Sequence, residues 1–229
     1  MPSPEKIIFL VVFFPLFMIA VMAHEVAHGL AAYRQGDLTA KYAGRLTFNP
    51  VDHLDPMGSI VFVFTALFSP FVFGWAKPVP INPLLFKQYR VGIIQVSLAG
   101  VAANLALVIF GAIALKVLLL SGVVADQDAY WVINYMRPEN PGLSYYLAWL
   151  IYMFMVLNIV LFIFNLIPVP PLDGSKVLMM LLPREQAIAF ERIEPYGMFI
   201  ILFLIMSGVT SMIFNPILHM LRVGILHMI

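Results

Sequence analysis

The chain has 229 residues, of which 62% are hydrophobic and 11% are charged, and its formal net charge is +1. A soluble domain carries roughly 45–50% apolar and about 25% charged residues, so these proportions exclude an ordinary soluble domain and make the lipid bilayer the expected solvent. The near-neutral charge and the lack of a basic run predict that no nucleic acid is bound. Because the chain has no cysteine, any metal would be held by His, Asp, Glu or backbone oxygen.

The first predicted element is a membrane-spanning helix from Ile7 to Tyr33. It exceeds the about 20 apolar residues that a span requires, even with Pro15 inside it. A cleaved signal peptide is the alternative for its apolar first part. The run continues as a helical pattern into His24–His28 without a hydrophilic mature start, so we expect the helix to be retained.

The next segment, residues 35–56, is polar and rich in turn-forming residues. Partial alternation of apolar and polar residues over 38–48 predicts a short β-hairpin at the membrane edge. Residues 57–75 are apolar again, but Ser69 and Pro70 interrupt them. This segment is either a further span or a re-entrant segment that enters the membrane and returns on the same side.

Three later spans are predicted at Val91–Ser121, Ser144–Ile167 and Tyr196–Ile217. We therefore expect an all-α polytopic membrane protein with about four transmembrane helices, a re-entrant segment and the short β-hairpin. Apolar runs extend along the whole chain, so residues 1–229 are expected to form a single integral membrane domain.

The distribution of Lys and Arg favours the re-entrant alternative, because cytoplasmic loops are enriched in these residues. If residues 57–75 re-enter, nine basic residues share one side: Arg34, Lys41, Arg45, Lys77, Lys87, Arg90, Lys176, Arg184 and Arg192. Three lie on the other side: Lys6, Arg137 and Arg222. A full span would give a weaker division of seven against five. We therefore expect an outside N-terminus, cytoplasmic loops 34–56, 76–90 and 168–195, and insertion in the cell (plasma or inner) membrane.

The motif His24-Glu25-Val26-Ala27-His28 carries the first chemistry. On a helix, residues i and i+4 share one face, so the two imidazoles can bind one metal ion. Glu25 can act as general base toward a water whose pKa zinc lowers to about 7. The pattern fixes three positions and can arise by chance. However, ionisable groups inside a bilayer cost about 2.5–3.5 kcal/mol each and are usually functional.

Asp173 is the candidate for a third metal ligand, because a catalytic zinc takes three protein ligands and keeps one position open. It follows a proline-rich stretch at 168–171, which ends the preceding span. Asp173 could instead cap a short helix beginning near Gly174, which is a common role of Asp. Because the two histidines lack a third ligand, we favour metal binding by Asp173. The predicted topology puts both the histidines and Asp173 in the cytoplasmic half of the membrane.

These motifs resemble those of the site-2 protease family of intramembrane zinc metalloproteases. The resemblance rests on His24–His28 and on Asn165-Leu-Ile-Pro-Val-Pro-Pro-Leu-Asp173-Gly174. It extends to the loop 44–58, to Gly74–Pro83 and to Ser97–Asn104, where Val101 stands in place of the family's proline.

The resemblance implies zinc as cofactor, with His24, His28 and Asp173 as ligands and Glu25 as catalytic base. It also implies that Asn165 binds the substrate backbone. The expected activity is hydrolysis of peptide bonds in transmembrane protein or peptide substrates, within or near the bilayer, as in regulated intramembrane proteolysis. The active site is expected to lie toward the cytoplasm. The PDZ and CBS modules of other members have no counterpart in the chain, and no oligomeric state is predicted.

Three other functions would use part of the same pattern. A membrane protease that trims prenylated proteins takes its third ligand from a Glu on another helix, and no Glu besides Glu25 is expected at membrane depth. A transporter or metal carrier would use these residues as a polar pathway and would not need Glu25 as a base. An inactive relative would hold membrane substrates without cutting them, which the complete ligand set disfavours.

Other polar residues are expected to have structural roles. His53 is interpreted as a structural loop residue, with a second metal site or a substrate contact as the alternative. Asn104 and Asn158 lie within predicted spans and are expected to form helix–helix hydrogen bonds.

Overall fold

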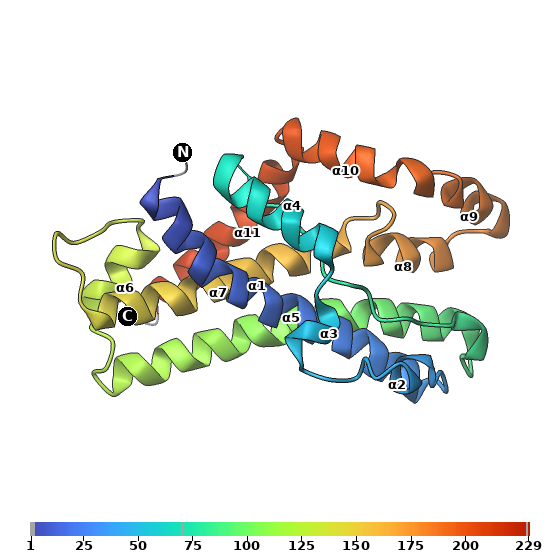
Figure 1. Ribbon diagram of the computed structural model, residues 1–229, viewed down its shortest axis with the longest axis horizontal. Helices are drawn as coiled ribbons and strands as arrows, with labels where there is room; N and C mark the ends of the chain where they lie inside the picture. The colour runs from blue at the N-terminus through green and yellow to red at the C-terminus, as the bar shows by residue number, and fades with distance from the viewer. Residues whose placement is uncertain (1–2, 70, 228) are drawn as a thin grey trace. The chain divides into compact units, whose positions relative to one another are not determined.

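The computed structural model describes residues 3–69, 71–227 and 229, and these residues form helices and turns but no strand. The α-helices are α1 (Pro4–Arg34), α2 (Thr39–Tyr42), α3 (Pro50–His53), α4 (Pro56–Phe68), α5 (Tyr89–Leu120), α6 (Asp126–Ile133), α7 (Leu143–Leu166), α8 (Asp173–Leu181), α9 (Arg184–Glu191), α10 (Gly197–Met206) and α11 (Val209–Leu226) (Figure 1). Short 3₁₀ turns lie at Pro83–Leu85 and Glu194–Tyr196. The all-α class is therefore confirmed. Residue 70, within the predicted segment 57–75, lies outside the described residues.

Four helices within the described residues are long and apolar enough to cross a membrane: Lys6–Arg34 of α1, and α5, α7 and α11. The first three match predicted spans to within two residues at each end. Helix α1 continues through Pro15, as the sequence predicts. The number of candidate spans agrees with the prediction.

The predicted boundaries of the fourth span, Tyr196–Ile217, are wrong. Helix α10 ends at Met206, and Gly208 adopts a left-handed conformation with φ 77°. A glycine in this conformation typically ends a helix. A separate helix, α11, then begins at Val209. Because the apolar sequence is continuous across the break, hydropathy alone could not locate it.

The chain divides into two compact units. The first takes the chain up to Ala103 together with Lys176–Leu181, and the second takes Asn104–Ser175 together with the chain from Leu182 onward. Helix α5 therefore begins in the first unit and ends in the second, and α8 begins in the second and ends in the first. The division does not follow chain order, and a single domain over 1–229 stays a prediction.

In the first unit, α4 packs against α1 through aromatic side chains. The ring of Phe62, which is 1% exposed, has its centroid 4.6 Å from that of Phe17 and 5.3 Å from that of Phe14. The helix is capped by Asp55, whose Oδ1 accepts the N–H of Gly58 at 2.7 Å. With 13 residues, α4 is shorter than the about 20 that a span requires.

After α4 the chain folds back within the first unit. A Cβ at Gly58 would lie 2.2 Å from the carbonyl oxygen of Trp75, so the close return requires glycine. The N–H of Lys77 donates to the carbonyl of His53 at 2.9 Å. These contacts show that the chain folds back, but they do not show how deep the segment lies in a membrane. The structure therefore does not support the re-entrant segment predicted at 57–75 as a membrane element.

The β-hairpin predicted over 38–48 is wrong. Thr39–Tyr42 forms a single helical turn, and Gly44 follows it with φ 66°. Asp37 initiates the turn, because its Oδ1 accepts both the N–H and the hydroxyl of Thr39. Such local side-chain bonds compete with strand pairing, and they outweigh a short alternating pattern.

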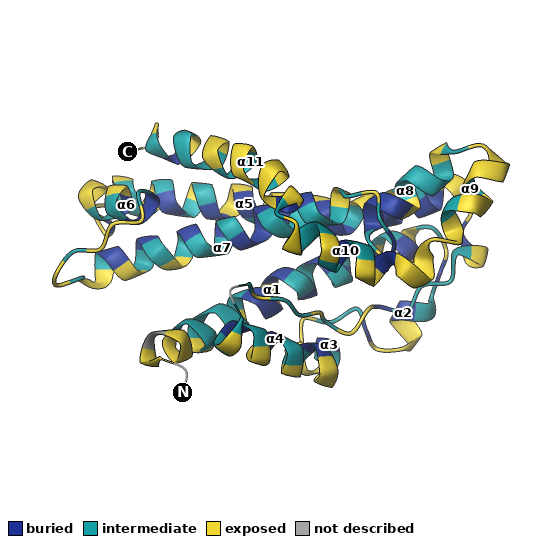
Figure 2. Ribbon diagram, turned by 90° about the horizontal axis from the view of Figure 1, so that it is seen from above, coloured by how far each residue is buried: buried dark blue, intermediate teal, exposed yellow. Residues whose placement is uncertain are grey.

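In the second unit, α6, α7, α11 and the end of α5 share an apolar core. Its buried members are Leu115, Val124, Ala129, Val132, Ile133, Tyr145, Ala148, Tyr152, Met155 and Ile225. Figure 2 shows more exposed positions along α11 than along α7. The side chain of Asn104 donates to Oδ1 of Asn158 at 3.0 Å, and both residues are fully buried. The predicted helix–helix hydrogen bond is therefore confirmed for this pair.

Candidate metal centre

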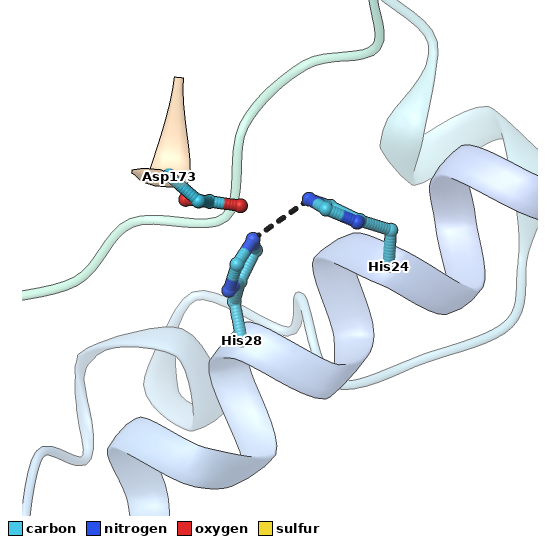
Figure 3. Close-up of side chains that lie close together, drawn as sticks. All are labelled: His24, His28 and Asp173. Carbon is cyan, nitrogen blue, oxygen red and sulfur yellow. Dashed lines mark hydrogen bonds between the residues drawn. The ribbon is translucent and has the colours of Figure 1, made fainter. Parts of the chain in front are cut away.

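Helix α1 presents His24 and His28 on one face, as their i, i+4 spacing predicts. Both side chains are buried. Their Nε2 atoms are 2.9 Å apart, and the two rings meet edge to face at 89° (Figure 3). Two imidazole nitrogens that converge in this way can bind the same cation.

Helix α5 orients one of these imidazoles. Nδ1 of His28 lies 2.6 Å from the backbone carbonyl oxygen of Val96. A carbonyl oxygen can only accept, so we assign the proton to Nδ1, and the lone pair of Nε2 is then available to a metal. Metal-binding histidines are commonly fixed by such a bond to a carbonyl.

Gly100, also on α5, lies directly against both imidazoles. A Cβ at this position would be 2.5 Å from Nε2 of His28 and 2.7 Å from Cε1 of His24. Any larger residue would therefore occupy the space of the histidine rings. Sequence reasoning assigned no role to Val96 or Gly100. The run of small residues around Ser97 and Gly100 was the available signal, and it does not identify the helix face that they contact.

Asp173 is the first residue of α8 and is buried. The preceding turn is tight, since a Cβ at Gly174 would lie 2.3 Å from the carbonyl oxygen of Leu166 at the end of α7. The bond Pro170–Pro171 within this turn is cis. The turn thus brings the start of α8 directly against the end of α7.

His24, His28 and Asp173 form one buried group in which the possible ligand atoms all lie within 4.8 Å of one another (Figure 3). Two imidazole nitrogens and one carboxylate oxygen are a donor set that suits zinc and leaves a position open. The residues present therefore fit a zinc ion.

Glu25 is partly buried beside this group, and its carboxylate is held by the backbone. Oε2 accepts the N–H of Val79 at 2.8 Å. Val79 lies 54 residues away in the chain, and sequence reasoning did not predict this contact.

Asn165 lies in the last turn of α7 and is partly buried. Its side-chain amide donates to the carbonyl of Leu161 in its own helix at 3.0 Å. Its predicted contact with substrate stays a prediction.

His53 is fully buried, and its Nε2 lies 2.8 Å from the carbonyl oxygen of Thr47. In the part of the chain that the structure describes, it belongs to no group of possible metal ligands. Its backbone carbonyl also holds Lys77. These contacts agree with the structural role that the sequence favours.

Comparison with known proteins gives one family match and two relatives. The model of peptidase family M50 matches residues 12–208. "Putative zinc metalloprotease YwhC" of Bacillus subtilis is 34% identical over 209 residues, which cover 91% of this chain and 86% of that protein. "Putative zinc metalloprotease Rip2" of Mycolicibacterium smegmatis is 26% identical over 193 residues, which cover 83% of this chain and 65% of that protein. No solved structure gives a significant match.

Proposed function

The chain belongs to peptidase family M50 and is a zinc metalloprotease of the membrane, and from this premise we propose that it cuts transmembrane proteins within or beside the bilayer. The active site lies toward the cytoplasm in this proposal. The excess of Lys and Arg in the loops 34–56, 76–90 and 168–195 supports that orientation.

The observation that carries the proposal is the buried group of His24, His28 and Asp173, whose possible ligand atoms all lie within 4.8 Å of one another. We assign these three residues as zinc ligands. Ionisable side chains at membrane depth are costly, and three that converge on one point are best explained by a bound cation. The bond between His28 and the carbonyl of Val96 supports the assignment, because it directs Nε2 toward the shared point.

Glu25 is assigned as the general base. When bound, zinc polarises the scissile carbonyl and acidifies the attacking water. The Glu25 carboxylate takes a proton from that water and later delivers it to the nitrogen of the leaving amine. Asn165 binds the backbone of the substrate through its amide oxygen, since its N–H already bonds to Leu161.

A membrane-spanning substrate must unwind locally before it is cut, because the side chains and hydrogen bonds of a helix shield its peptide bonds. His24 and His28 lie on α1, which is long and apolar enough to cross a membrane, and this supports a substrate that enters from the membrane or its edge. Regulated intramembrane proteolysis is the process in which such a cut would operate.

The test is zinc content and cleavage of a single-span model substrate by the purified protein in detergent. We expect about one zinc per chain in the wild type, in agreement with three protein ligands for a single ion. Glu25→Gln is expected to keep zinc and lose cleavage, and Asp173→Ala to lose zinc. His219→Ala and Asp126→Ala replace exposed residues of the same types and serve as matched controls with unchanged zinc and cleavage.

Three outcomes would contradict the proposal. Full zinc content in Asp173→Ala would move the third ligand elsewhere. Retained cleavage in Glu25→Gln would exclude Glu25 as the general base. Metal binding without any cleavage by the wild type would favour a metal carrier or an inactive relative.

A further inference from the structure

The segment 74–82, the strap, has neither helix nor strand and joins the fold-back after α4 to the turn before α5. It belongs to a stretch on which the family resemblance rests, and no role has been assigned to it. Pro78 and Pro80 flank Val79. Proline fixes its own φ and restricts the preceding residue to extended conformations. Because proline has no N–H, Val79 provides the sole backbone donor between 78 and 80.

Charged side chains hold the strap on both sides of Val79. Nη2 of Arg45 donates to the carbonyl of Lys77 at 2.7 Å. Oδ2 of Asp37 accepts the N–H of Asn82 at 2.7 Å. Arg45 and Asp37 are both buried, and all these residues belong to the first compact unit. The backbone around Val79 is therefore fixed at two points.

The charge state of Asp37 favours this anchoring. Burial raises the pKa of its carboxyl, but hydrogen bonds from the Thr39 hydroxyl and from the N–H groups of Asn82 and Thr39 outweigh burial and lower the pKa below the ordinary 3.8. Asp37 is thus a carboxylate at neutral pH, and its bond to the strap is charge-assisted.

Val79 is joined to α1 by two contacts. Its N–H donates to Oε2 of Glu25 at 2.8 Å. Its side chain is buried, and its Cγ1 lies 3.1 Å from the position that an added Cβ would take on Gly29. Gly29 lies one helical turn beyond Glu25. Within the described residues, no other hydrogen bond to the Glu25 carboxylate is present.

We propose that the N–H of Val79 is the positioning group for the catalytic base: it binds Oε2 of Glu25 and leaves Oε1 to accept the proton of the attacking water. The inference rests on the proposed function, which assigns Glu25 as that base. A free glutamate side chain samples many rotamers, and a misplacement of about 1 Å at a reacting group can cost on the order of 100-fold in rate. The strap limits this freedom through a backbone donor that the flanking prolines and the two anchors keep in place.

The direct test replaces the amide of residue 79 with an ester by incorporating the α-hydroxy acid that carries the valine side chain. This change removes the N–H and keeps the side chain. We expect kcat to fall about 10–100-fold, as for the loss of a hydrogen bond to a charged group, with KM and zinc content unchanged. The same ester at Ile81 is the matched control and is expected to keep the wild-type kcat.

A second measurement is independent of activity. In zinc-free protein, hydrogen–deuterium exchange at the Val79 amide is expected to be slower in the wild type than in Glu25→Ala. Equal exchange in the two proteins would refute the hydrogen bond.

The outcomes separate this inference from the proposed function. Equal kcat for the esters at 79 and 81, or loss of zinc from the ester at 79, would overturn the positioning role while the protease assignment stands. No cleavage by the unmodified, zinc-loaded protein would refute the proposed function and, with it, the catalytic meaning of the contact.

Discussion

Replacing Gly100 with alanine is expected to weaken zinc binding by about 10–100-fold, the usual cost of disturbing residues that support metal ligands. The added Cβ would lie 2.5 Å from Nε2 of His28 and 2.7 Å from Cε1 of His24, whereas an ordinary contact begins at 3.4 Å. The rings would therefore have to move by most of an ångström, or α5 would have to withdraw. Metal–ligand distances tolerate changes of only about 0.2 Å. Withdrawal of α5 would also stretch the bond from His28 to the carbonyl of Val96.

The assay is a zinc titration of the metal-free protein in detergent against a fluorescent chelator that competes for the ion. Gly224→Ala is the matched control, because Gly224 lies in α11 with no atom within 4 Å of an added Cβ. Thermal unfolding of both metal-free variants separates a loss of fold, expected at about 1–3 kcal/mol for overpacking, from a loss of affinity. Wild-type affinity in Gly100→Ala would refute the contact between α5 and the histidines, and with it the role of α5 in the metal centre.

Three other perturbations test further parts of the structure. Gly197→Ala would place a Cβ 1.9 Å from the carbonyl oxygen of Pro170 in the turn before Asp173, so zinc affinity and the unfolding temperature should both fall, as measured by titration and thermal scan. Asn158→Leu removes a buried hydrogen bond between helices and should cost about 0.6–1.7 kcal/mol in an unfolding assay in detergent; unchanged stability would contradict the bond. Because the pKa of Asp37 is lowered in the fold, its stabilisation should be constant from about pH 5 to 8 and be lost as the pH falls through the lowered value. The difference in unfolding free energy between wild type and Asp37→Asn should therefore shrink only below about pH 4.

The residues proposed for the chemistry could be singled out from the sequence because polar groups are conspicuous in an apolar chain. His24, Glu25 and His28 interrupt a predicted span, and Asp173 follows a proline-rich break at the end of another. Each would be costly without a partner or a function. The same reasoning predicted a helix–helix bond for Asn158, and the structure contains it.

Elements whose boundaries depend on local backbone conformation were predicted less well. The break at Gly208 lies within a continuous apolar run, and it requires a positive φ that hydropathy does not record. The turn at Thr39–Tyr42 replaces the expected hairpin because the side chain of Asp37 bonds to the first residues of the turn. In both places a conformational preference of one or two residues decides the structure.

The supporting part of the metal centre was not predictable, because it consists of groups that have no side-chain signature. The carbonyl of Val96, the missing Cβ of Gly100 and the N–H of Val79 act on residues 54 to 76 positions away in the chain, at His28, His24 and Glu25. Because every residue has backbone groups, the sequence does not indicate which of them bind a functional side chain. A glycine in a helix can likewise have no effect on the site. We therefore expect that intact motif residues alone would not suffice for activity in this architecture. A variant that keeps every proposed ligand and the base, but carries a larger side chain at Gly100 or lacks the N–H of Val79, should lose zinc affinity in the first case and turnover in the second.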